Sequence, residues 1–143
     1  MSEIKTNKLT GTSTAGSILV TGEGNSTTTS LQQGLAKAWT NFNGEGTAAI
    51  LDSMNTASLT DSGTGKFSIT FTNAMGNVYY VFTGLAFHSG AAGFDDAVCI
   101  SRDTTQLSSV STTVNPFYTM RVEGNQEIKD CKENMVTFNG DLA

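Results

Sequence analysis

The sequence predicts an all-β protein, namely a compact antiparallel β-sandwich or Greek-key barrel that follows an extended N-terminal arm. Short apolar stretches recur at intervals of about 8–12 residues, and turn residues such as glycine and asparagine separate them. Several stretches alternate apolar and polar residues with a period of two, and no segment sustains a helical period. Charged residues make up only 15% of the chain, while threonine, serine and glycine are abundant. This composition favours strands joined by tight turns over a disordered, charge-rich chain.

Residues 1–33 differ from the rest and are expected to form an arm that anchors the chain and joins copies of it. This segment contains no aromatic residue, and its apolar side chains are few and widely spaced. Burial of so few side chains does not compensate for the conformational entropy lost when the segment becomes ordered. We therefore expect sister chains or a docking surface to order the arm; the alternative is a flexible leader. The candidate oligomerisation residues are Ile4, Leu9, Ile18, Val20 and Leu31.

Residues 34–143 are expected to form the β-sandwich domain, which begins with two paired strands. The first strand covers residues 34–42, where two sets of side chains alternate. Asn43–Gly44 comes next, and this dipeptide is a strong signal for a hairpin to the second strand, residues 47–53. Trp39, the only tryptophan, is interpreted as the core anchor of the first strand, because its small neighbours allow close packing. The alternative is an exposed tryptophan that serves as a binding platform.

The rest of the domain is predicted as a second hairpin followed by further strands. This hairpin covers residues 57–73 and turns through the glycine-containing residues 61–65, after which apolar residues recur with a period of two. Residues 77–87 are almost wholly apolar, which predicts a strand buried on both faces. Further strands are expected at residues 97–103, 107–114, 117–123 and 134–140, and a charged loop at residues 123–134. The predicted core anchors are Trp39, Phe42, Phe67, Ile69 and Phe71.

The charge and the apolar pattern exclude several classes of partner. The net charge is -5 and the pI is about 4.6, so the chain lacks the basic face of a nucleic-acid-binding protein. No apolar run approaches the roughly 18 residues that span a bilayer, so membrane insertion is not expected. The first residues lack the apolar stretch of a signal peptide, which predicts that the chain folds in a cytoplasm.

Residues with catalytic or metal-binding chemistry are scarce, so neither an enzyme nor a cofactor is expected. The single histidine, His88, has Asp95 and Asp96 nearby in the sequence but no nucleophile elbow. The two aspartates lack the spacing of a calcium loop, and the histidine does not form a zinc-ligand pattern with Cys99 and Cys131. The sequence does not decide whether the two cysteines are bridged.

Aromatic side chains beside loops are the remaining candidates for ligand contact. The chain has more aromatic residues than a small core requires, and Phe94 and Tyr118 lie next to predicted loops. Aromatic residues combine apolar area with, in tyrosine, a polar group that can bind a hydroxyl. Phe94 and Tyr118 are therefore the candidate residues for contact with a host, with a surface glycan as the ligand.

Residues 34–84 contain two long and specific patterns. The first reads KAW-x-NFNG-x-GT, and the second is a hairpin that reads D-x-GTG-x-F, then a further phenylalanine, then AM. The residues that match are Lys37, Ala38, Trp39, Asn41, Phe42, Asn43, Gly44, Gly46, Thr47, Asp61, Gly63, Thr64, Gly65, Phe67, Phe71, Ala74 and Met75. This segment resembles one that recurs in tail-fibre and other virion appendage proteins of bacteriophages, particularly those of marine and cyanobacterial hosts.

The resemblance implies a non-enzymatic structural protein of the virion that forms homotrimers and uses no cofactor. Long fibres of this kind carry shaft repeats, which this chain lacks, so the implied form is a short tail fibre or spike. The implied partners are other tail or capsid proteins, and the implied location is the virion, assembled in the host cytoplasm. Two alternatives remain open: a capsid decoration protein, such as a head fibre or cement protein, and a glycan-binding module for host adsorption.

Overall fold

The computed structural model describes two compact units of the chain. The described residues are 3–11, 18–22, 24, 27–88, 98–102, 110–121 and 127–143. The units are Met1–Leu35 and Ala36–Ala143, so the division follows residue 35, against residue 33 in the sequence analysis. Among the described residues, no helix has the length and apolar character needed to cross a membrane.

The N-terminal unit contains a small hairpin and one helical turn. Strands β1 (Leu19–Thr21) and β2 (Thr28–Ser30) pair in antiparallel fashion, and α1 (Leu31–Gly34) follows directly. The hydroxyl of Ser30 caps this turn by accepting a hydrogen bond from the Gln33 amide (3.5 Å). The strands are too short to bury apolar side chains, so the described part of the arm has no core of its own.

The candidate oligomerisation residues of the arm lie largely at its surface. Ile4 is 90% exposed, Leu9 60% and Val20 52%, while Ile18 and Leu31 are partly buried. The carbonyl of Ile18 accepts a hydrogen bond from the Leu31 amide (2.9 Å), which joins the hairpin to α1. The arm therefore presents most of its apolar side chains outward.

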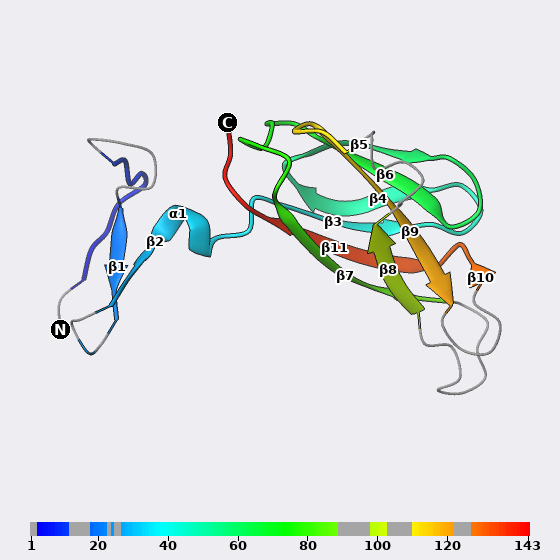
Figure 1. Ribbon diagram of the computed structural model, residues 1–143, viewed down its shortest axis with the longest axis horizontal. Helices are drawn as coiled ribbons and strands as arrows, with labels where there is room; N and C mark the ends of the chain where they lie inside the picture. Colours follow the sequence, from blue (N-terminus) through cyan, green and yellow to red (C-terminus); the bar gives the residue numbers. More distant parts are fainter. Residues whose placement is uncertain are drawn as a thin grey trace. The chain divides into compact units, whose positions relative to one another are not determined.

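Two antiparallel sheets pack face to face in the second unit, and they do not close into a barrel (Figure 1). The four-stranded sheet has the order β4-β3-β11-β7, with bounds Ala49–Met54, Ala38–Asn43, Glu133–Asn139 and Val81–Phe87. The five-stranded sheet has the order β10-β9-β6-β5, with bounds Glu127–Ile128, Val114–Arg121, Lys66–Phe71 and Thr56–Asp61. Strand β8 (Val98–Arg102) also pairs with β9. The prediction of an all-β sandwich is confirmed.

A single asparagine carries the chain from one sheet to the other. Asn55 lies between β4 and β5 and has a left-handed backbone (φ 57°), a conformation that asparagine tolerates better than most residues. Its amide nitrogen donates hydrogen bonds to the carbonyls of Lys37 (3.0 Å) and Asn73 (3.1 Å). The side-chain carbonyl oxygen of Asn55 accepts a hydrogen bond from the backbone amide of Asn73 (2.7 Å). These bonds fix the corner of the sandwich.

The predicted hairpin at residues 57–73 is confirmed as β5 and β6. The carboxylate of Asp61 accepts a hydrogen bond from the Gly63 amide (2.9 Å) and so begins the turn. Gly63 and Gly65 both have positive φ, at 122° and 62°, which explains the glycines of the D-x-GTG pattern. The carboxylate of Asp130 accepts a hydrogen bond from the Gly65 amide (2.6 Å) and ties the turn to the segment after β10.

Aromatic rings from both sheets fill the core. Phe42 packs edge-on against Phe67, with ring centroids 5.1 Å apart, and Phe71 packs against Phe138 at 4.9 Å. Four of the five predicted core anchors are confirmed. They are Phe42 (0% exposed), Phe67 (2%), Ile69 (0%) and Phe71 (4%).

The prediction that Trp39, the fifth candidate, is a core anchor is wrong. In β3, Ala38 and Phe42 point into the core, and Trp39 points to the opposite face of the sheet, where it is partly exposed. Gly44, one of the small residues near Trp39 in the sequence, makes room for Phe67 instead. A Cβ at Gly44 would lie 2.8 Å from Cζ of that phenylalanine.

Three further expectations about strands need correction. The apolar stretch 77–87 becomes a strand only over Val81–Phe87, and one of its faces is exposed, not buried. Of the predicted strand 107–114, residues 112 and 113 form a bend, where the hydroxyl of Ser111 accepts hydrogen bonds from the amides of Thr113 and Val114, and β9 begins at Val114. The expected charged loop contains the short strand β10, which pairs with the end of β9.

Candidate functional site

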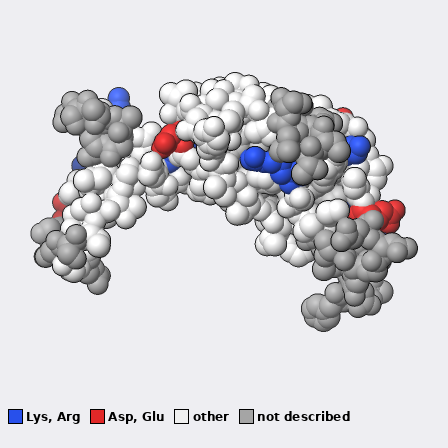
Figure 2. Space-filling view, in the orientation of Figure 1, with Lys and Arg blue, Asp and Glu red and all other residues white. Residues whose placement is uncertain are grey.

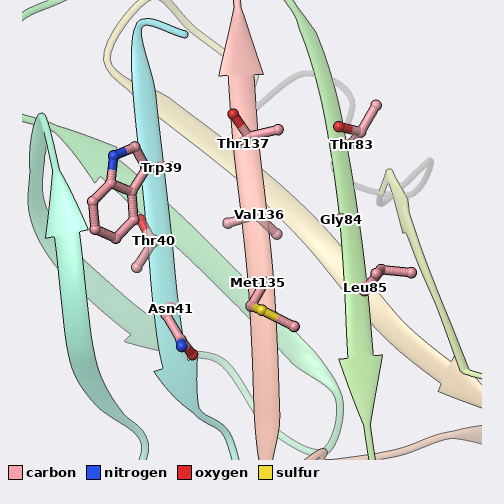
Figure 3. Close-up of a pocket in the computed structure, with 9 residues that line it drawn as sticks. All are labelled: Trp39, Thr40, Asn41, Thr83, Gly84, Leu85, Met135, Val136 and Thr137. Atoms are coloured by element: carbon pink, nitrogen blue, oxygen red, sulfur yellow. The ribbon is translucent and has the colours of Figure 1, made fainter.

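The outer face of the four-stranded sheet carries a shallow groove of about 590 Å³. Three neighbouring strands line it: β3, β11 and β7 (Figure 3). The lining residues are Trp39, Thr40, Asn41, Thr83, Gly84, Leu85, Met135, Val136 and Thr137. The groove is thus built from the middle of the sheet and not from its loops.

Strand register places the lining side chains in two cross-strand rows. Trp39 lies opposite Thr137, which lies opposite Thr83. In the next row, Asn41 lies opposite Met135, which lies opposite Leu85. Because side chains two residues apart share one face of a strand, both rows point away from the core. The apolar bodies of these residues form the walls of the groove.

The side chains between these two rows point into the core. The backbone of the three strands therefore forms the floor of the groove. Thr40 and Val136 are buried, and the hydroxyl of Thr40 lies 2.7 Å from that of Thr56 in the opposite sheet. Gly84 completes this row on β7. A Cβ there would lie 2.6 Å from the backbone carbonyl oxygen of Met135, so the pairing of β7 with β11 requires a glycine at this position.

The groove has little charge and few polar groups. Among the described residues that line it, none is ionisable at neutral pH; Asp52, opposite Asn41 on β4, and Glu133, opposite Phe87, lie beyond its ends. The side-chain oxygen of Asn41 is buried and has no hydrogen-bond partner in the described structure. This arrangement provides a surface for apolar contact and offers no nucleophile or acid–base pair.

Uncharged residues cover most of the described surface of the sandwich in the view of Figure 2 as well. The 15% of charged residues in the sequence agrees with this sparse pattern. A surface of this kind loses little hydration free energy when another protein covers it, because few ions must be desolvated.

The candidate host-contact residues do not come together at this groove. Tyr118 lies on β9, in the other sheet, and its ring has the Lys66 ammonium 5.8 Å from its centroid. Phe94 lies outside the described residues, as do Asp95 and Asp96. The proposed role of Phe94 and Tyr118 in host contact therefore stays a prediction.

A second hollow, of about 400 Å³, contains His88 together with acidic residues. Its lining includes Glu45, Glu127, Lys129 and Asp130. One of the carboxylates is already used, since Asp130 holds the turn before β6. Among the described residues, no group of three or more histidine, cysteine or acidic side chains has the geometry to hold a metal ion.

Both cysteines are free thiols, which answers the question that the sequence left open. Cys131 is completely buried, and its Sγ lies 3.6 Å from the Lys129 carbonyl. Burial in a weakly polar environment disfavours the thiolate, and it raises the pKa of Cys131 from 9.0 to about 11. This thiol is therefore a packing residue and not a nucleophile.

The raised pKa of Cys131 predicts a loss of stability in alkaline solution. Below about pH 9 the thiol is neutral in both states; as the pH rises toward about 11, it ionises first in the unfolded chain. The free energy of unfolding should therefore fall by at most about 2–3 kcal/mol across this range. Urea unfolding at several pH values measures the slope. The Cys131→Ala variant should show a shallower slope than wild type, and an equal slope would contradict the assignment. Cys99→Ala is the control.

Replacement of Trp39 by alanine is expected to lower the free energy of unfolding by about 1–2 kcal/mol, since the ring loses only contacts on an outer face. Within a single chain, the space that the ring leaves is open to water, so no closed cavity forms in the sandwich. Chemical denaturation of Trp39→Ala, followed by far-UV circular dichroism, gives the value. A loss above about 3 kcal/mol would be typical of a core residue and would restore the interpretation made from the sequence.

Sequence reasoning missed most of the groove. Leu85 lies in a stretch that was expected to be buried on both faces, and Met135 lies in one that was predicted only as a strand. An apolar residue on an exposed sheet face has no signature that separates it from a buried one. The one signal in the sequence was the alternation around Trp39, which allows either set of side chains to face outward. Comparison with protein-family models, with curated proteins and with solved structures finds no match to this chain.

Proposed function

We propose that the chain is a non-enzymatic structural subunit of a bacteriophage virion, a short tail fibre or spike made of three copies. The observation that carries this proposal is the exposure of the arm. Ile4, Leu9 and Val20 are each more than half exposed. Val20 belongs to the β1–β2 hairpin, in which each strand is only three residues long. An isolated two-stranded hairpin is marginally stable in water, so a segment of this kind needs a partner to stay ordered.

The resemblance to virion appendage proteins supplies the kind of assembly. Most of its motif residues lie in β3, in the β3–β4 loop and in the β5–β6 hairpin, while Lys37 directly precedes β3 and Ala74 and Met75 follow β6. The amide of Asn43, for example, donates to the carbonyls of Glu45 (2.7 Å) and Thr47 (3.4 Å) and so shapes the loop of the first pattern. A motif that specifies a scaffold and no reactive group supports a structural role.

The location of the protein on purified particles tests this proposal. Phage particles that encode the chain would be labelled with an antibody against the sandwich and viewed by electron microscopy, while quantitative mass spectrometry counts the copies. We expect the label at the tail, with a small multiple of three copies per particle. Label spread over the head, with many copies per particle, would assign the chain to capsid decoration and not to a tail fibre. Absence of the chain from purified particles would overturn the proposal.

A further inference from the structure

We infer that the outer face of the sheet β4-β3-β11-β7 is an interface with a second copy of this chain. The inference rests on the proposed function, in that it assumes that copies assemble. It adds a contact on the sandwich itself, separate from the contact proposed for the arm.

The first argument is the exposure of large apolar side chains on this face. Val81 and Leu85 are each 61% exposed and Phe87 is 54% exposed, all on the outward side of β7. Met54, opposite Trp39 on β4, is 40% exposed. Together with the groove, these residues extend from one edge of the sheet to the other. Large apolar side chains that are exposed together on one face mark an interaction surface in soluble proteins.

The two outer faces of the sandwich differ, and the difference assigns the contact to this sheet. On the five-stranded sheet, the outward residues of β5 and β6 are polar and include Thr60, Lys66, Ser68 and Thr70. Strand β9 adds Val114, Pro116 and Met120 to this face, but none of the largely exposed apolar side chains among the described residues lies on this sheet. The low content of charged residues in the whole chain does not explain why the two outer faces of one small domain differ. The apolar face is therefore a local feature that a partner covers.

Edge strand β7 supports the same conclusion. Among the described strands it pairs only with β11, and it lies at the end of its sheet. Exposed edges of monomeric proteins commonly carry lysine, proline or a bulge that blocks association. The strand VFTGLAF has none of these, and its register with β11 runs without a shift from Val81 to Phe87. It lacks the features that keep a monomer from associating.

The size and charge of the face favour a second copy over another partner. Four strands about 4.8 Å apart and about 20 Å long offer roughly 400 Å² in projection. A stable interface buries about 800 Å² per partner, so the face needs a second contact from the same partner. Another copy of the chain supplies this second contact, because it also carries the exposed arm. The face has few charges, with Asp52 and Glu133 among its described residues, so two copies of it can approach without strong repulsion.

The chain carries its own reporter for this contact, since its only tryptophan, Trp39, lines the groove. The test compares full-length wild type with Leu85→Glu, which places a charge on the outward side of β7, beside the groove. Thr60→Glu, at an exposed position on edge strand β5 of the other sheet, is the matched control. Each protein is measured by analytical ultracentrifugation and by acrylamide quenching of tryptophan fluorescence. Circular dichroism confirms that each is folded, and Thr83→Glu, at an already exposed polar position, is used if Leu85→Glu does not fold.

We expect wild type and Thr60→Glu to share one oligomer mass and weak quenching, and Leu85→Glu to show a lower mass and stronger quenching. Unchanged mass and quenching in Leu85→Glu, with an oligomeric wild type, would overturn the inference and leave the proposed function intact. A wild type that sediments as a 15.0 kDa monomer at every concentration would instead contradict the proposed assembly. A monomer whose quenching falls when purified lipopolysaccharide is added would assign the face to glycan binding and also overturn the inference.

Discussion

Replacement of Phe138 by alanine is expected to lower the free energy of unfolding by about 3–5 kcal/mol. The side chain is fully buried and its ring lies 4.9 Å from that of Phe71, 6.0 Å from that of Phe82 and 6.2 Å from that of Tyr80. Alanine leaves a cavity that rings from both sheets cannot refill by small movements. A domain of this size has a total stability of about 5–15 kcal/mol, so the substitution removes a large share of it.

Urea denaturation of Phe138→Ala, followed by circular dichroism, measures this loss. Phe138→Leu is the control, because it keeps most of the volume and should cost less than about 2 kcal/mol. Equal and small losses in both variants would mean that the aromatic cluster around Phe138 does not stabilise the contact between the sheets.

Gly65→Ala is expected to cost about 3–5 kcal/mol, from backbone strain and steric overlap together. Gly65 has φ 62°, which an alanine adopts only with strain. A Cβ would also overlap Cγ2 of Ile128 and would lie 2.6 Å from the amide nitrogen of Lys129 and 2.7 Å from the carbonyl oxygen of Thr119. The substitution should therefore push β10 away from β9.

Gly46→Ala separates the two contributions to this cost. Gly46 has nearly the same backbone angle, φ 67°, but no atom lies within 4 Å of the position that its Cβ would take. It should lose only the strain, about 1 kcal/mol. If thermal unfolding shows equal losses for the two glycine variants, the close packing of β10 around Gly65 is not part of the stable fold.

The hairpins and the core were predictable because two independent signals agreed. In β6, apolar residues recur with a period of two, and the glycines before them mark a tight turn. Phe67, Ile69 and Phe71 must then share one face, and the burial of aromatic area assigns that face to the core. Here local geometry and hydrophobic burial require the same arrangement, so the sequence was sufficient.

Trp39 shows where this reasoning fails. A period of two divides a strand into two sets of residues, but it does not say which set faces inward when both contain large apolar groups. Side-chain size favoured Trp39, whereas the rest of the sheet favoured Ala38, Thr40 and Phe42. The decision depends on how β3 packs in the whole sheet, including its pairing with β11, which is distant in the sequence.

The exposed face of β7 was unpredictable for a related reason. Residues 81–87 are apolar on both faces, which is also the signature of a fully buried strand. In the described chain one face contacts the core and the other contacts no other part of the sandwich that would bury it. Apolar residues on both faces are expected for a strand that its own chain buries on both sides and also for a strand whose outer face is a contact surface, so this pattern does not separate the two cases.

The central claim is that the fold of this chain is completed by other copies of it, and dilution of the full-length protein tests it most directly. Thermal unfolding and mass by light scattering would be measured over an approximately hundredfold range of concentration. We predict that the mass exceeds that of the 15.0 kDa chain and that both the mass and the Tm fall together on dilution. A single chain mass with an unchanged Tm over the whole range would contradict the claim.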